Sequence, residues 1–189
     1  QMCIRDSLQG VDYVYTLHGQ LKSINYPSLN SAHDPGKDGV TGSPNAGVEE
    51  DLFGFALDYY QDDYERTGTN IGSSVTTAGA GYHNGLIKAT RWKIKDQNEI
   101  LHSSGNEELY PAGSNDKELM YEYTYDNFYR LETATFGVYD NDATSNAFAS
   151  TTDYKVYGGV SNTGITYDII GNITSLKRNG YDAASNPPG

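Results

Sequence analysis

Alternation of apolar and polar positions with a period of two dominates this chain. It is clearest at residues 121–131, where three tyrosines at alternate positions fall on one face of a predicted strand. Asp126 follows where a tight turn uses a side chain that accepts a hydrogen bond from the backbone two residues on. Leu131 then begins the return strand. This stretch therefore predicts a β-hairpin.

Similar alternation recurs along the sequence and predicts further strands at residues 11–26, 53–59, 82–95 and 164–176. Within residues 82–95, the dipeptide Asn84-Gly85 is a strong short-range hairpin signal and predicts a turn before a return strand. The one candidate helix, residues 106–121, is interrupted by Pro111 and Gly113. The pattern predicts an all-β fold of successive antiparallel hairpins in a twisted sheet.

Polar segments rich in Ser, Asn, Gly and Asp separate the predicted strands. They have too few apolar side chains to order themselves independently, so we expect inserted, exposed loops. Their approximate bounds are residues 27–50, 61–81, 96–117 and 140–152. Residues 71–75 are expected to pack locally.

Composition agrees with a β protein, because the 189 residues include 17 Tyr and 21 Gly but only five Phe and one Trp. Thirteen Lys and Arg against 25 Asp and Glu give a formal net charge of −12. This charge opposes binding to nucleic acid, and we expect no nucleic-acid partner. No run approaches the roughly 18 apolar residues of a spanning helix, so we also expect no membrane span.

The two ends of the chain lack the alternating pattern. Residues 1–7 resemble the translation of a transposon-end adapter used in sequencing libraries, and we exclude them from the fold argument. Cys3 is excluded with them, and no other cysteine remains for a disulfide, a thiol catalyst or a zinc site. Residues 179–189 contain Ser, Asn, Pro and Gly and show no strand pattern. We therefore expect residues 8–189 to be a fragment of a longer protein.

Three stretches align at fixed offsets: residues 13–21, 123–131 and 165–173. They resemble the YD repeat of the RHS family, Tyr-x-Tyr-Asp-x-x-Gly-Arg-Leu. The positions that carry the resemblance are Tyr13, Tyr15, Gly19 and Leu21; Tyr123, Tyr125, Asp126, Arg130 and Leu131; Tyr167, Asp168, Gly171 and Ile173; and, in a shortened copy, Tyr82 and Gly85.

The match is partial. Thr16 replaces the turn Asp in the first copy, and Tyr129 replaces the turn Gly in the second. Gln20 and Asn172 stand at the Arg position of the other two copies. If Tyr129 keeps a left-handed conformation, the cost is on the order of 1 kcal/mol; otherwise the turn changes type there.

The resemblance implies a β-ribbon whose hairpins lie side by side in a spiralling sheet. In bacterial members of the family such sheets close into a hollow shell that holds a C-terminal toxin or effector, and other members act at cell surfaces. The implied location is secreted or cell-surface. The implied partners are the remaining repeats of the same chain and an encapsulated C-terminal domain, with a surface glycan or receptor as the alternative. The family's self-cleaving core has no matching positions here.

Few residues suggest catalysis or a cofactor. Asp126 and Asp168 could form a pair of acid and base groups, but a turn role explains each of them better. No serine nucleophile elbow or phosphate-binding loop occurs, and the four histidines lack metal-ligand spacing. We expect no enzyme activity, no cofactor and no metal ligands with a recognisable motif.

Calcium and carbohydrate remain alternatives at the loops and tyrosines. Asp140 begins a segment like a calcium loop, but that segment lacks the required Gly and ends in Thr151 rather than Glu. A looser calcium site among the acidic loops stays open. Exposed tyrosines could stack on sugar rings, although packing between neighbouring strands is favoured. The expected function is a non-catalytic segment of a shell wall, with a carbohydrate- or receptor-binding β module as the alternative.

Overall fold

The computed structural model describes residues 10–65, 71–75, 80–95, 117–140, 147–150, 154–158 and 164–180. Within these ranges it contains eleven strands and no helix, which confirms the all-β prediction. In that part of the chain, accordingly, no helix is long and apolar enough to cross a membrane. The strands are β1 (Tyr13–Tyr15), β2 (Leu21–Ile24), β3 (Phe53–Asp58), β4 (Ala89–Ile94), β5 (Glu118–Tyr125), β6 (Leu131–Asp140), β7 (Ala147–Ser150), β8 (Val156–Tyr157), β9 (Thr166–Tyr167), β10 (Ile173–Ser175) and β11 (Lys177–Arg178).

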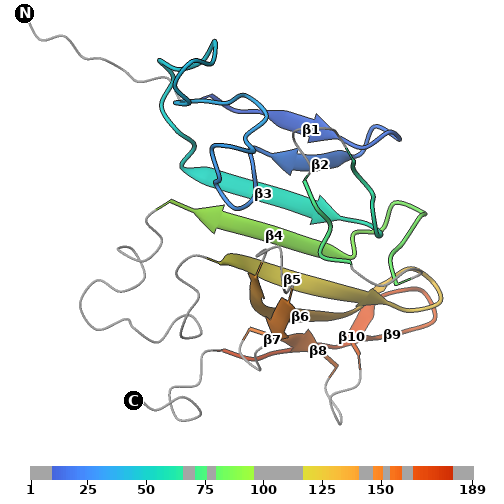
Figure 1. Ribbon diagram of the computed structural model, residues 1–189. Coiled ribbons are helices and arrows are strands. Elements are labelled where there is room, and N and C mark those ends of the chain that lie inside the picture. The colour runs from blue at the N-terminus through green and yellow to red at the C-terminus, as the bar shows by residue number, and fades with distance from the viewer. Residues whose placement is uncertain are drawn as a thin grey trace, which may run out of the picture.

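Nine strands form one antiparallel sheet in the order β1-β2-β3-β4-β5-β6-β8-β11, with β7 also paired to β6. The first six strands lie side by side in chain order, and the sheet twists from β1 to β8 (Figure 1). Strands β9 and β10 form a separate hairpin. In the described residues the large sheet does not close on itself, and its strand order ends at β1 and β11, while β7 pairs only with β6.

One face of the sheet carries a layer of aromatic rings. Trp92 on β4 stacks against Tyr121 on β5, with ring centroids 6.0 Å apart. Tyr121 also contacts Phe136, its cross-strand partner on β6, at 5.1 Å. Tyr154 meets Phe136 edge to face at 5.5 Å. Alternation along the strands thus places rings from three strands together, as expected for cross-strand stabilisation.

The opposite face buries charged side chains among apolar ones. Arg91 pairs in register with Ala56 on β3 and with Met120 on β5, so all three point to this face. Ile71, which is fully buried, belongs to the short segment 71–75, and the Gly72 carbonyl accepts a hydrogen bond from Arg91. Residues 71–75 are therefore packed, but against distant parts of the sheet and not only locally as expected.

The Asn84-Gly85 prediction is only partly right. Residues 83–85 form a turn, and Gly85 has a φ of 90°. The strand that pairs with β4, however, is β3, which ends at Asp58. The turn therefore does not join two paired strands, and the return strand begins at Ala89 rather than at Leu86. Long-range pairing with β3 overrides the local hairpin signal.

Two of the expected loops contain more structure than their composition indicates. Residues 27–50 form successive tight turns, and Asp34 and Asp38 within them are buried. The segment 140–152 contains β7, which pairs with β6 in register from Gly137↔Ser150 to Asp140↔Ala147. Neighbouring strands supply hydrogen bonds that a local composition argument does not see. The predictions for residues 1–7, for most of 96–117 and for 181–189 fall outside the described residues.

Candidate functional site

Three of the aligned stretches fold into the same turn. The backbone N–H of the fourth turn residue donates to the carbonyl of the first: Gly19 to Thr16, Tyr129 to Asp126 and Gly171 to Asp168, at 2.9, 2.9 and 3.1 Å. Asp126 Oδ1 accepts bonds from the backbone N–H groups of Phe128 and Arg130. Asp168 Oδ1 does the same with Ile170 and Asn172. In the first copy the Thr16 hydroxyl accepts from the Gln20 N–H.

The last position of each turn has a left-handed backbone. The φ values are 78° at Gly19, 63° at Tyr129 and 92° at Gly171. Tyr129 therefore keeps the turn type of its glycine counterparts instead of changing it. A non-glycine residue in this conformation carries steric strain of roughly 1–2 kcal/mol.

The residue after the left-handed position binds the remaining turn oxygen. Arg130 Nε lies 2.7 Å from Asp126 Oδ2, and Asn172 Nδ2 lies 2.8 Å from Asp168 Oδ2. Desolvation alone would raise the pKa of the Asp126 carboxyl, but the hydrogen bonds from Arg130 and Phe128 and the charge of Arg130 together outweigh it and lower this pKa. Hydrogen bonds from Asn172 lower the pKa of Asp168. Both carboxylates are thus fully engaged as acceptors in their own turns.

Arg130 also connects two of the repeats. Its guanidinium carbon lies 4.3 Å from the ring centroid of Tyr167, which belongs to the next hairpin. The same group lies 5.1 Å from the ring of Phe128. Arg130 therefore closes its own turn and packs on the following copy by a cation–π contact.

Tyrosine hydroxyls join each hairpin to the one before it. Tyr125 donates to the Ile87 carbonyl at 2.9 Å, and Tyr167 donates to the Leu131 carbonyl at 2.7 Å. A third such bond runs from Tyr59 to the Leu21 carbonyl at 2.9 Å.

These three hydroxyl bonds have nearly the same sequence separation, which is 38, 36 and 38 residues. The acceptors are also equivalent. Leu21, Ile87 and Leu131 each lie two residues after a residue with positive φ, at positions 19, 85 and 129. Burial raises the pKa of Tyr125 and of Tyr167, so both phenols remain protonated donors. We call these three bonds the hydroxyl rungs.

A buried ion network extends across four neighbouring strands. Lys22 Nζ lies 2.6 Å from Asp58 Oδ1 and 2.7 Å from Asp63 Oδ1. Arg91 Nε lies 2.7 Å from Asp58 Oδ2, and its Nη1 lies 2.5 Å from Glu118 Oε2. All five side chains are at most 5% exposed. This network is a buried link between β2, β3, β4 and β5.

The network holds Asp58 and Arg91 in their charged forms. Burial alone would raise the pKa of Asp58, but the positive charges of Arg91 and Lys22 outweigh it and hold this pKa well below its ordinary value. Burial opposes the charge of Arg91, yet Asp58 and Glu118 raise the pKa of its guanidinium. Burial raises the pKa of the neighbouring Tyr139 to about 12. Asp63 differs from Asp58, because burial outweighs the charge of Lys22 and raises the pKa of its carboxyl.

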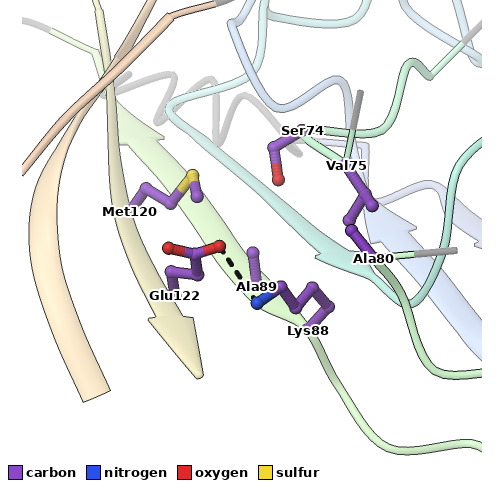
Figure 2. A pocket seen from close by; sticks show the side chains of 7 residues that line it. All are labelled: Ser74, Val75, Ala80, Lys88, Ala89, Met120 and Glu122. Carbon is purple, nitrogen blue, oxygen red and sulfur yellow. Dashed lines mark ion pairs between the residues drawn. The ribbon is translucent and has the colours of Figure 1, made fainter. Parts of the chain in front are cut away.

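A small pocket opens beside this network, between β4, β5 and the segment after β3 (Figure 2). It is lined by Ser74, Val75, Ala80, Lys88, Ala89, Met120 and Glu122. Its volume is about 120 Å³, whereas pockets for small-molecule ligands span roughly 300–1,000 Å³. Lys88 Nζ and Glu122 Oε1 form an ion pair of 3.1 Å across it. The pocket fits a few waters rather than an organic substrate.

The histidines lie apart in the described residues. His33 stacks on Tyr26 with ring centroids 5.5 Å apart, and His83 contacts the ring of Tyr60 in a tilted arrangement at 4.2 Å. His18 lies in the first turn, and His102 falls outside the description. Asp140, proposed as the start of a calcium-like loop, pairs with Lys117 at 3.1 Å, while residues 141–146 are not described.

Sequence reasoning missed the ion network, the Tyr59 rung and a cluster of aspartates around Asp34. For Arg91, the sequence shows only that it shares a strand face with Ala89, and it does not show that this face is covered. For Tyr59, the signal was its separation from Leu21, which matches that between Tyr125 and Ile87.

The fold and its turns define a class, namely an open antiparallel sheet built from tandem hairpins with tyrosine-bearing strands. Comparison with protein-family models, with curated proteins and with solved structures finds no match.

Proposed function

We propose that this chain is a non-catalytic structural segment of an RHS/YD-repeat protein. It forms part of the wall of a secreted or cell-surface β shell that encloses a C-terminal toxin or effector. The observation that carries this proposal is the series of hydroxyl rungs, because they repeat one contact between successive hairpins. Such a contact extends a sheet one unit at a time, as repeat architectures do.

The exposed first strand supports continuation of the wall. Tyr13 and Tyr15 on β1 are 58% and 55% exposed. Tyr15 is the counterpart of Tyr125 and Tyr167, yet no described residue accepts a hydrogen bond from its hydroxyl. A preceding repeat would supply the missing carbonyl and cover the edge of the sheet.

The chemistry of the described residues favours a role without catalysis. The carboxylates of Asp126 and Asp168 are occupied by their own turns. Asp58 and Arg91 are buried in mutual ion pairs. The pocket beside them is too small for an organic substrate, which leaves architecture as the function that the residues support best.

A carbohydrate- or receptor-binding module is the second candidate. The observation in its favour is again the exposure of Tyr13 and Tyr15, because an aromatic plane with a hydroxyl suits a sugar ring. The two candidates differ in what covers these rings, which is another repeat in the first and a glycan in the second.

Tyr15→Phe distinguishes the two candidates when it is made both in this chain and in the intact protein that contains it. We expect no change in the stability of the 189-residue chain but a loss of about 1 kcal/mol in the intact protein, where the rung would form. Electron microscopy of the intact protein should show a hollow shell, and limited proteolysis should spare the enclosed domain. An extended particle with a protease-sensitive C-terminal domain would overturn the proposal. Saturable binding of the 189-residue chain on a glycan array, lost in Tyr13→Ala and Tyr15→Ala, would favour the second candidate.

A further inference from the structure

Four aspartates gather where the segment before β1 meets the insertion between β2 and β3. One carboxylate oxygen from each of Asp12, Asp34 and Asp38 lies within 4.8 Å of those of the other two. Asp51, just before β3, has its side chain within hydrogen-bond reach of Asp34. The four acids come from three separate stretches of the chain, so the fold, not local sequence, brings them together. We call them the aspartate cluster.

Most of this cluster is buried without a partner. Asp34, Asp38 and Asp51 are 3%, 4% and 9% exposed. Each of the four has one buried oxygen that receives no hydrogen bond, namely Asp12 Oδ2, Asp34 Oδ1, Asp38 Oδ2 and Asp51 Oδ1. No described lysine or arginine forms an ion pair with any of the four, in contrast to the network around Asp58. Buried carboxylates without a countercharge are costly, and either a bound cation or a proton relieves that cost. Burial and the neighbouring acids raise the pKa of Asp51 to about 7, so a cation is the means that leaves all four acids charged.

The surrounding backbone is shaped around these oxygens. A Cβ atom added at Gly10 would overlap Asp38 Oδ2, and one added at Gly36 would overlap Asp12 Oδ2. The backbone N–H of Gly36 donates to the Asp12 carboxylate, and the N–H of Asp38 donates to Asp34 Oδ2. Two glycines therefore let the main chain pack closely against Asp38 Oδ2 and Asp12 Oδ2, two of the oxygens that receive no hydrogen bond.

We propose that the aspartate cluster is a calcium site. All of its ligands are hard carboxylate oxygens, which suit Ca²⁺. With Ca–O distances of about 2.3–2.6 Å, two ligands of one ion stand no more than roughly 5 Å apart, and the three oxygens meet this limit. Mg²⁺ fits less well, because it demands a tight octahedron and keeps most of its waters.

A bound ion would fasten the insertion at residues 27–50 to the sheet. Asp34 and Asp38 belong to the insertion, whereas Asp12 adjoins β1 and Asp51 adjoins β3. The site thus cross-links the loop to two strands near one edge of the sheet. This role goes beyond the proposed wall function and does not depend on it.

Calorimetric titration of the metal-free 189-residue chain with CaCl₂ tests the site. We expect one Ca²⁺ per chain, with a dissociation constant on the order of 10⁻⁶ to 10⁻⁴ M. Asp38→Asn removes one charge and should weaken binding by about tenfold or more. Asp62→Asn is the matched control. It makes the same change at an exposed acid whose φ of 56° asparagine tolerates, and it should leave the affinity unchanged.

A melting experiment separates a metal site from a purely structural cluster. In EDTA, Asp38→Asn should melt above the unsubstituted chain, because it relieves repulsion among the acids; in millimolar Ca²⁺ the order should reverse. Lower melting of Asp38→Asn by the same amount in both buffers would overturn the proposal. So would the absence of Ca²⁺ binding and of any Ca²⁺-induced change in circular dichroism, or equally tight binding of Mg²⁺. If the chain is unfolded in EDTA, appearance of the β signal on adding Ca²⁺ but not Mg²⁺ supports the site.

Discussion

The hydroxyl of Tyr125 donates a 2.9 Å hydrogen bond to the backbone carbonyl of Ile87, which precedes it by 38 residues. This bond is not part of the β-ladder, so it ties two hairpins together independently of strand pairing. Because the acceptor belongs to the main chain, either leucine or isoleucine can stand there, as Leu21 and Leu131 do in the other rungs. The tyrosine is the residue that the contact requires.

Tyr125→Phe removes this hydroxyl and keeps the ring. We expect the free energy of unfolding to fall by about 1 kcal/mol, the usual net value of one hydrogen bond. Tyr167→Phe should have a similar effect through the Leu131 carbonyl. Urea denaturation of the 189-residue chain measures both. Tyr15→Phe is the control and should leave the midpoint unchanged, because no described residue bonds its hydroxyl. Equal loss in all three variants would mean that the rungs contribute nothing specific.

Asp58→Asn breaks the buried ion network at its centre. Asp58 faces both Lys22 and Arg91 and is fully buried. Removing one member of a buried pair leaves an uncompensated charge, so we expect a loss of about 3–5 kcal/mol in unfolding free energy. Glu50→Gln makes the same chemical change in the exposed pair with Lys95 and should cost less than about 1 kcal/mol. Comparable losses in the two variants would contradict the dominance of the buried network.

The stability difference between the unsubstituted chain and Asp58→Asn should also depend on pH. The folded-state pKa of Asp58 lies below its unfolded value of about 3.8, because Arg91 and Lys22 outweigh the effect of burial. The contribution of its charge is therefore fully present above pH 3.8 and is lost as the pH falls through the folded-state pKa. The stability difference between the unsubstituted chain and Asp58→Asn should be constant from pH 5 upwards and shrink below about pH 4. If the stability difference between the two proteins instead became smaller as the pH rose from 5 to 7, the folded-state pKa of Asp58 would be raised and not lowered.

Sequence reasoning reached the fold class because alternation is a local signal. The hairpin between β5 and β6 follows directly from the tyrosines and the turn at Asp126. Alternation also placed Arg91 and Trp92 on opposite faces, but it did not tell which face is covered. That depends on the segment containing Ile71, whose packing on the sheet is a tertiary contact.

The features that the sequence did not predict share one physical cause, because each depends on contacts with residues far away in the chain. Asn84-Gly85 carries a strong hairpin signal, yet β4 pairs with β3 because the six-residue register between them satisfies more backbone groups than a local turn would. The aspartate cluster likewise joins Asp12 to Asp34 and Asp38 across β1 and β2. Composition marks such residues as polar loop, and only the fold shows that they are buried.

Tyr129→Gly should stabilise the chain. Tyr129 has a φ of 63° at the place where the equivalent turns have Gly19 and Gly171. Glycine adopts this conformation without strain, so we expect a gain of about 1 kcal/mol, reduced somewhat by the greater flexibility of glycine in the unfolded chain. Thermal and urea denaturation measure the change.

The converse substitution provides the control. Gly171→Ala adds a Cβ that meets no atom within 4 Å, so any loss reports backbone strain alone. We expect a decrease of about 1 kcal/mol. If Tyr129→Gly destabilises while Gly171→Ala is neutral, the left-handed turn does not control the stability of these hairpins.

The exposed edge strand β1 leads to a prediction about association. Tyr13 and Tyr15 alternate along an edge that pairs only with β2, which leaves a row of backbone groups open to another chain. We expect the 189-residue chain to self-associate in a concentration-dependent way, as measured by sedimentation velocity. Replacing both tyrosines by lysine places charges on the edge and should shift the chain toward monomer. Phe128→Lys with Tyr129→Lys is the control, because it makes the same change of charge at an exposed turn outside this edge. A chain that is monomeric at all concentrations before any substitution would show that β1 is not an adhesive edge, and would remove one support for the proposed continuation of the wall.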